Sequence, residues 1–213
     1  KHVFLKKKNK ILLLQNKALA LSMFLSLPAS VALIVGSEQI ISALFGYGSF
    51  DQNAVANSAR ALYYFSLGLP AFALIKVFST FFFANHDTKT PFYISLVSVI
   101  VNILISIFYF RSIGFIIIPI ATTISSWFNS ILLFIFLKNR DLFQFNQIFL
   151  VRFFKTIIVS IIMGVVFKYL ILIFENQLNY DYNLKSLYLI LIVFLALVFY
   201  LLLSLIIKAF KYG

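Results

Sequence analysis

The chain has 213 residues, of which 62% are hydrophobic and only 11% are charged, and its mean hydropathy is +1.02. A soluble domain has roughly a quarter of its residues charged, so this composition excludes a soluble globular protein and indicates an integral membrane protein. The net charge of +12 does not indicate a nucleic-acid partner, because the basic residues lie mostly between apolar blocks. The chain has no cysteine, which excludes disulfides and thiolate chemistry.

The first 17 residues, KHVFLKKKNKILLLQNK, interleave lysines with apolar side chains. We expect either an amphipathic helix on an anionic cytoplasmic membrane surface or an ordinary cytoplasmic loop. The chain begins with Lys1 rather than Met and shows no cleavable signal peptide. We therefore expect it to be the later part of a longer protein.

Six apolar blocks follow that are long enough to cross a bilayer, which takes about 20 helical residues. Pro28 lies inside the first block and predicts a kink there. Residues 39–45 either extend that block or form a short interfacial helix, and two glycines predict a turn at 46–49. Asp51 is a candidate N-cap for the second block. The predicted spans are residues 18–35, 58–84, 91–110, 113–137, 153–174 and 186–207.

Short polar links separate the later spans. Arg111 and Ser112 form the predicted turn between the third and fourth spans, and so short a link requires antiparallel neighbouring helices. The predicted fold class is an all-α membrane protein with six transmembrane helices. Its predicted parts are a cytoplasmic segment at 1–17, four helices at 18–137, a cytoplasmic linker at 138–152 and two C-terminal helices at 153–213.

Loop charges predict the orientation of these helices, because Lys and Arg concentrate on the cytoplasmic side of membrane proteins. With both chain ends inside, only Arg111 and Lys185 lie in outside loops, and Arg60, Lys76 and Lys168 lie within spans. We therefore predict that both termini are cytoplasmic. The cations then placed inside are Lys1, Lys6, Lys7, Lys8, Lys10, Lys17, Lys89, Lys138, Arg140, Arg152, Lys155, Lys208 and Lys211.

Nothing in the sequence is typical of an enzyme. The acidic residues fall at span ends or in loops, without a pair placed for acid–base catalysis, and the two histidines are isolated. No Gly-rich phosphate loop of the Walker type is present. We expect no catalytic residue, no metal site and no cofactor.

The second span carries the polar groups that most need an explanation. Gly68 and Pro70 interrupt it, and Lys76 lies about eight residues, roughly 12 Å, from its inner end. Lys76 either faces a water-filled cavity and an anionic substrate or extends along its stem to the inner surface. Arg60, near the outer end, is expected to anchor the helix or to pair with Asp51 rather than to contact substrate.

Two neighbouring spans also carry polar faces. On the third span four polar residues with 3–4 spacing form one stripe, centred on Asn102. These faces predict either the lining of a shared cavity or hydrogen bonds between packed helices. The stripe is Ser95, Ser98, Asn102 and Ser106, and the patch on the fourth span is Thr122, Thr123, Ser125, Ser126 and Asn129.

The sequence FGYGSFD, followed by ARALYYFSLGLPAFALIKVFSTFFFANHDTKTP, resembles the MurJ (MviN) lipid II flippases of the multidrug/oligosaccharidyl-lipid/polysaccharide (MOP) exporter superfamily. The family pattern has a Gly-x-Phe turn, a Gly-Leu-Pro-Ala-Phe-x-Leu-x-Lys-Val core and an Asp-Thr-x-Thr-Pro loop. These motifs correspond to residues 48–50, 68–77 and 87–91. The resemblance is specific over about residues 18–137, whereas the last two spans match in hydropathy and position.

The resemblance implies that the chain is the C-terminal part of a fourteen-helix, two-lobed transporter of the bacterial inner membrane. Such transporters move undecaprenyl-pyrophosphate-linked precursor across the membrane by alternating access, and their last two helices form a groove for the lipid tail. The implied partners are this anionic lipid-linked substrate, membrane lipids and the N-terminal lobe. Lys76, Arg60 and Asn102 become candidate substrate-binding residues, and Gly68 and Pro70 a candidate hinge.

Two other functions stay open from the sequence. One is a related exporter of the same superfamily that carries polysaccharide-lipid or drugs, and the other is a membrane scaffold subunit that transports nothing. The resemblance implies that the principal cavity arginines of the flippase family correspond to positions upstream of Lys1. We therefore expect that this chain alone does not transport lipid.

Overall fold

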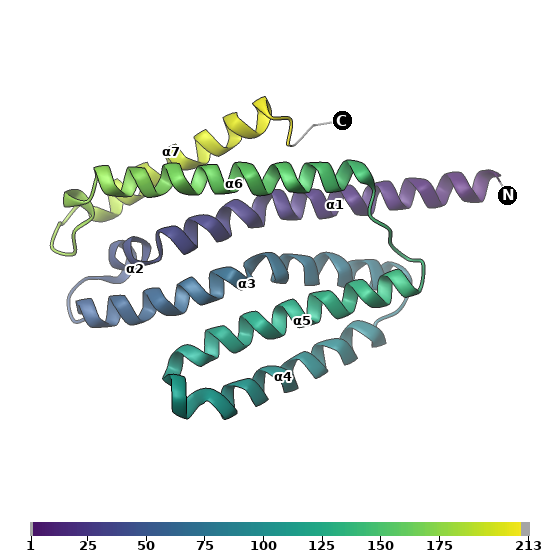
Figure 1. Cartoon of the computed structure of the whole chain (residues 1–213), viewed down its shortest axis with the longest axis horizontal. Helices are drawn as coiled ribbons and strands as arrows, with labels where there is room; N and C mark the ends of the chain where they lie inside the picture. The colour runs from purple at the N-terminus through teal and green to yellow at the C-terminus, as the bar shows by residue number, and fades with distance from the viewer. Residues whose placement is uncertain (1, 210–213) are drawn as a thin grey trace. The chain divides into compact units, whose positions relative to one another are not determined.

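The computed structural model describes residues 2–209, with side chains from residue 10 onward, and within that range it contains helices and no strand. Each of six long helices contains most or all of one predicted span, which confirms the all-α membrane fold (Figure 1). Lys1 and Lys211 lie outside the described residues, and the cytoplasmic placement of both termini stays a prediction. The long helices are α1 (His2–Val35), α3 (Gln52–Ala84), α4 (Lys89–Ile113), α5 (Ile117–Asn139), α6 (Gln147–Ile173) and α7 (Lys185–Ile206).

Three short elements join them: α2 (Ser37–Phe45), the 3-10 turn η1 (Gly114–Ile116) and the 3-10 turn η2 (Asn176–Leu178). Residues 39–45 lie in the short helix α2 and do not extend the first span, while an interfacial position of this helix stays a prediction. The predicted segment at 1–17 belongs to α1 from His2 onward, so helix and first span are one element. Pro28 and Pro70 both lie inside helices that continue past them.

The chain divides into two compact units. The first comprises Lys1–Ser26 and Gly68–Phe154, and the second comprises Leu27–Leu67 and Lys155–Gly213. Two of the three points where the chain passes between the units lie within three residues of Pro28 or Pro70. From the sequence we placed boundaries at residues 17, 137 and 152. They divide the chain in the order of its helices, not into compact units, and they stay a prediction.

Phenylalanine rings form the core of the first unit. Phe143, which follows α5, is fully buried, and its ring centroid lies 5.5 Å from that of Phe81 and 6.0 Å from that of Phe78. Asn16 of α1 fixes the same connection: its Nδ2 donates to the Gln144 carbonyl at 2.9 Å, and its Oδ1 accepts from the Asn146 amide at 3.0 Å. The non-helical connection between α5 and α6 is therefore packed and hydrogen-bonded.

The turn between α4 and α5 corrects one prediction. Arg111 and Ser112 are still helical, and the chain reverses at Gly114 and η1 instead. Gly114 has φ 74° and ψ −154°, a conformation that a residue with a Cβ rarely adopts. The prediction that these two helices are antiparallel neighbours is confirmed by hydrogen bonds between their side chains, described below.

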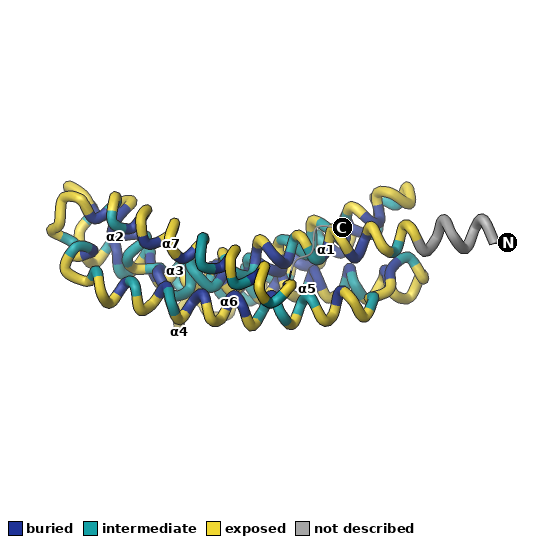
Figure 2. Tube along the Cα trace, turned by 90° about the horizontal axis from the view of Figure 1, so that it is seen from above, coloured by how far each residue is buried: buried dark blue, intermediate teal, exposed yellow. Residues whose placement is uncertain are grey.

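The helix α4 exposes much of its apolar surface. Phe108 is 76% exposed and Ile107 68%, and exposed segments recur along the whole of α4 (Figure 2). An apolar surface of this extent on a long helix is expected where lipid or other transmembrane helices surround it. Together with the apolar lengths of the other helices, it identifies a multi-pass membrane protein.

Close helix packing and caps organise the second unit. A Cβ added at Gly164 of α6 would lie 2.4 Å from Val31 Cγ1 of α1, so glycine permits the approach of these two helices. Asp51 caps α3 as predicted, because its Oδ1 accepts from the Ala54 amide at 2.8 Å. Lys155 Nζ donates to the Ile207 carbonyl at 3.0 Å, which places a cation at the C-terminus of α7.

Candidate functional site

Lys76 is exposed on α3 in the first unit. Its carbonyl accepts a hydrogen bond from Thr80 Oγ1 at 2.9 Å, and within residues 10–209 its ammonium forms no ion pair or hydrogen bond. A free ammonium on an exposed helix face fits both the cavity and the inner-surface alternatives. Its role in substrate binding stays a prediction.

Arg60 is exposed on the part of α3 that belongs to the second unit. The alternative that it pairs with Asp51 is wrong in this structure: within residues 10–209 the ion pair that is present joins Arg140 and Asp87, and Asp51 instead caps its helix. The three predicted binding residues are therefore not gathered within one unit, since Lys76 and Asn102 belong to the other.

Asn102 lies half-buried between α4 and α5. Its Nδ2 donates to Thr122 Oγ1 at 3.1 Å and to Ser125 Oγ at 3.2 Å. Two turns earlier on α4 and one to two turns later on α5, Asn129 Nδ2 donates to Ser95 Oγ at 3.4 Å. These contacts confirm the interhelical alternative for the two polar faces, while a direct contact of Asn102 with substrate stays a prediction.

Gly68 and Pro70 are both buried in α3, which continues through them as one helix. A Cβ at position 68 would lie 2.9 Å from Thr123 Oγ1 and 3.3 Å from Thr123 Cα. Glycine at this position therefore lets α3 and α5 pack closely. The first unit resumes at Gly68, which is the position that we predicted as a hinge.

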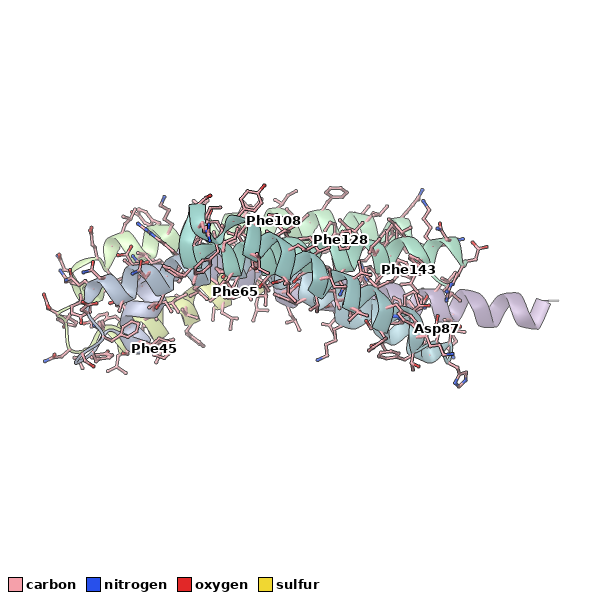
Figure 3. All side chains as sticks on the ribbon, turned by 90° about the horizontal axis from the view of Figure 1, so that it is seen from below. Phe45, Phe65, Asp87, Phe108, Phe128 and Phe143 are labelled. Atoms are coloured by element: carbon pink, nitrogen blue, oxygen red, sulfur yellow. The ribbon has the colours of Figure 1, made fainter. Side chains whose placement is uncertain are left out.

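Sequence reasoning missed a cluster that joins the α3–α4 loop to the end of α5. Asp87 is labelled in Figure 3; its Oδ1 accepts from the Thr90 amide at 3.0 Å, and its Oδ2 accepts from Thr90 Oγ1 at 2.6 Å. Arg140 donates through Nη1 to Asp87 Oδ2 and through Nη2 to Thr90 Oγ1, the latter at 3.1 Å. The Thr90 hydrogen bonds, assisted by the Arg140 charge, lower the pKa of Asp87 from 3.8 to about 2.

The backbone of this loop is fixed by a helix C-cap. His86 has φ 60°, its amide donates to the Phe83 carbonyl at 3.0 Å, and the Asp87 amide donates to the Phe82 carbonyl at 3.1 Å. This pattern is a Schellman motif with histidine at the left-handed position, which glycine usually occupies. It orients Asp87 toward the first turn of α4.

A second missed residue is Lys185, at the start of α7. Its side chain is 1% exposed, and its Nζ donates to the Gly46 carbonyl at 2.6 Å and to the Tyr180 carbonyl at 2.5 Å. The ammonium also lies 4.4 Å from the ring centroids of both Tyr47 and Tyr180. In the sequence Lys185 counted only as a charge in a loop. The tyrosines near it in sequence were the one signal that could have indicated its burial.

Further hydrogen bonds close this junction. Tyr47 Oη and Ser186 Oγ lie 2.6 Å apart, and Ser186 Oγ donates to the Ala43 carbonyl at 2.6 Å. Tyr180 Oη donates to the Phe50 carbonyl at 2.8 Å. We call Tyr47, Tyr180, Lys185 and Ser186 the lysine junction. It ties the turn after α2 to the segment that begins α7.

Comparison with known proteins identifies the relatives of this chain. The family model described as lipid II flippase MurJ matches residues 1–190. The probable lipid II flippase MurJ of Rickettsia prowazekii (strain Madrid E) is 39% identical over 57% of this chain and 24% of its own length. That of Rhizobium meliloti (strain 1021) is 37% identical over 71% of this chain and 28% of its own length.

The probable lipid II flippase MurJ of Thermotoga maritima is 34% identical over 80% of this chain and 33% of its own length. A solved structure of lipid II flippase MurJ in an inward closed conformation superposes with a TM-score of 0.75 and 25% identity. The match covers 94% of this chain and 40% of that structure. The chain thus spans about a quarter to a third of the length of the curated relatives that it matches.

Proposed function

Because the chain belongs to the lipid II flippase MurJ family, we propose that it is the C-terminal part of a transporter of the bacterial inner membrane. The whole protein flips lipid II, the undecaprenyl-pyrophosphate-linked peptidoglycan precursor, to the outer leaflet by alternating access. The observation that carries the proposal is the family match over residues 1–190, supported by the fold shared with a solved flippase. The remaining length of the relatives supports an N-terminal lobe as the necessary partner.

Within this function Lys76 supplies positive charge for the pyrophosphate. Its ammonium is exposed and unpaired within the described residues, so it is available to an anion without breaking an existing contact. A charged hydrogen bond to phosphate is among the stronger polar contacts in proteins. Arg60 is similarly exposed and gives a second cation on α3, whereas Asn102 acts by holding α4 and α5 together.

Gly68 and Pro70 form the hinge of the transport cycle. The division of α3 into two units at Gly68 and the missing backbone donor of Pro70 support a bend at this place. Transport by the full-length protein carrying Gly68→Ala together with Pro70→Ala tests this role. Intact transport by that double variant would make the bend purely structural.

The test of the proposal measures lipid II exposed on the outer surface of spheroplasts that depend on the full-length protein. We expect exposure to stop when the protein is depleted and to return when it is restored. Exposure that continues unchanged after depletion would instead favour an exporter of another lipid-linked substrate or a scaffold subunit.

The same assay tests Lys76. Lys76→Ala should lower the rate of exposure about ten- to a hundredfold, because a charged hydrogen bond contributes about 1.5–3 kcal/mol, and Lys76→Arg should retain most of it. Lys168→Ala, which removes another exposed cation from a long helix, is the matched control and should transport normally. Unchanged exposure with Lys76→Ala would remove Lys76 from the mechanism.

A further inference from the structure

A cavity of about 300 Å³ lies in the second unit beside the lysine junction. The helix α2, the start of α3, the end of α6 and the segment around η2 line it, and it is open on one side. Its polar lining comes from Glu38, Gln39, Ser42, Gln52, Glu175, Asn179 and Tyr180. All of these residues belong to the same unit, so the cavity forms within it.

Two unpaired carboxylates give this cavity its charge. Glu38 and Glu175 both line it, and within residues 10–209 neither side-chain carboxylate forms an ion pair or hydrogen bond. The adjacent cation Lys185 does not pair with them, because its ammonium contacts two backbone carbonyls and two tyrosine rings instead. Arg60 lies eight residues beyond Gln52 along α3, about 12 Å away. In a chain of net charge +12, this is a local concentration of negative charge.

Ser42 provides an independent observation. Its side chain is only 6% exposed, it lines the cavity, and its Oγ has no hydrogen-bond partner within the described residues. A serine inside a helix usually donates to the carbonyl four residues earlier, as Ser66 does to Leu62. A buried hydroxyl without a partner costs free energy, so a ligand that donates to this oxygen would relieve that cost.

We propose that this cavity binds an ammonium group, with Glu38 and Glu175 pairing with its charge and Ser42 accepting one of its N–H donors. An ammonium has three donors and no acceptor, which matches two carboxylates and a hydroxyl oxygen. The inference goes beyond lipid II transport and does not depend on it, because none of these residues was assigned to the substrate path.

The size of the cavity argues for an organic cation rather than a metal ion. About 300 Å³ is the lower range of small-molecule pockets, whereas Ca²⁺ needs six to eight oxygen ligands at 2.3–2.6 Å. Among the residues that the structure describes, no group of three His, Cys, Asp or Glu side chains could hold a metal. The ammonium belongs either to a phosphatidylethanolamine headgroup or to a soluble amine.

The experiment uses the purified full-length protein and measures equilibrium binding of ethanolamine and of glycerophosphoethanolamine by calorimetry. Both probes should bind saturably to the wild type. Glycerophosphocholine, whose trimethylated nitrogen has no N–H donor, should bind at least tenfold more weakly. Glu38→Gln combined with Glu175→Gln should weaken amine binding at least tenfold. Asp181→Asn, an exposed change in the same loop that does not line the cavity, should leave binding unchanged.

A second arm identifies the source of the ammonium. Native mass spectrometry of protein released from phosphatidylethanolamine or phosphatidylcholine nanodiscs should show retained phosphatidylethanolamine, lost in the double variant, if the source is lipid. Binding of ethanolamine without retained lipid identifies a soluble amine. The proposal is overturned if no amine binds in either arm, if the double variant binds like the wild type, or if Ca²⁺ displaces the amine.

Single variants guard against loss of folding in the double variant. Glu38→Gln alone, Glu175→Gln alone and Ser42→Ala should each weaken binding three- to tenfold while retaining the helical circular dichroism of the wild type. If the double variant does not fold, these three decide the question. Unchanged binding in all of them then contradicts the proposal.

Discussion

The α4–α5 hairpin and the lysine junction bury polar groups in different ways. In the hairpin, side chains of one helix meet side chains of the other, as when Asn102 donates to Thr122 and Ser125. In the junction, a buried cation and three hydroxyls bond mainly to backbone carbonyls at turns. The hairpin thus relies on weak contacts between neutral groups, whereas the contacts of the junction include a buried charge.

This difference predicts unequal sensitivity to mutation. A neutral interhelical hydrogen bond in a membrane protein contributes about 0.6 kcal/mol on average. Removing a buried cation leaves its acceptors without donors, and that loss is several times larger. Substitutions in the two regions, all measured by reversible unfolding of the full-length protein in mixed micelles, test this comparison.

The largest effect is expected at Lys185. Lys185→Met keeps the length of the side chain but leaves the carbonyls of Gly46 and Tyr180 without their buried donor. The free energy of unfolding should fall by about 2–4 kcal/mol. Lys168→Met, at an exposed cation, is the control and should change it by less than about 0.5 kcal/mol. If Lys185→Met lowers the free energy of unfolding by less than about 1 kcal/mol, the junction is no more sensitive to mutation than the hairpin.

The next effect concerns the packing of α5 against α3 rather than its hydrogen bonds. Gly68→Ala places a Cβ 3.3 Å from Thr123 Cα, so the helices must separate slightly. The free energy of unfolding should fall by about 1–2 kcal/mol. Without a clash the same change in a helix should stabilise by about 1 kcal/mol. A measured stabilisation would therefore show that the close approach imposes no strain.

The Asp87 cluster lies at the open end of the hairpin, where it joins the start of α4 to the end of α5, and it should respond to pH. The pKa of Asp87 is about 2 in the folded protein, below the ordinary value of 3.8 for an aspartate. The folded protein therefore binds this proton less readily than the unfolded chain does. The associated stability is present above pH 4 and is lost as the pH falls toward 2. For a partly exposed pair we expect about 1 kcal/mol or less. Asp87→Asn should flatten this part of the acid-unfolding profile. An unchanged profile would show that the Asp87 cluster does not contribute to the pH dependence of stability.

The smallest effect is expected in the hairpin. Asn102→Ala and Thr122→Ala should each lower the free energy of unfolding by about 1 kcal/mol or less, with a coupling near 0.6 kcal/mol in the double-mutant cycle. A coupling above 2 kcal/mol would show that the neutral hairpin contacts are as strong as those of the junction. The same variants should leave lipid II exposure unchanged if Asn102 acts only on packing.

Hydropathy and local motifs were sufficient to predict the helices, the cap at Asp51 and the antiparallel pairing of α4 and α5. These features depend on residues near one another in sequence or on a repeat along one helix. The turn was misplaced at Arg111 because a charge was taken to end the helix. Gly114, with its positive φ, was the better signal.

The two missed clusters have a different cause. Arg140 meets Asp87 across 53 residues, and Lys185 reaches the Gly46 carbonyl across 139 residues. Every residue has a backbone carbonyl, so a side chain that bonds to one has no partner recognisable in the sequence. Lys185 therefore counted only as a loop charge. The placement of Arg60 and Lys76 in different units also depends on packing, which hydropathy does not describe.

The connection between α5 and α6 has a practical consequence. Non-helical segments are usually cut first by proteases, and their amides exchange hydrogen fastest. Here the backbone amide of Asn146 donates a hydrogen bond to Asn16 Oδ1, and the Phe143 side chain in the same connection is fully buried. The segment should therefore resist proteases and exchange slowly, so it is a poor place to insert an affinity tag or a cleavage site.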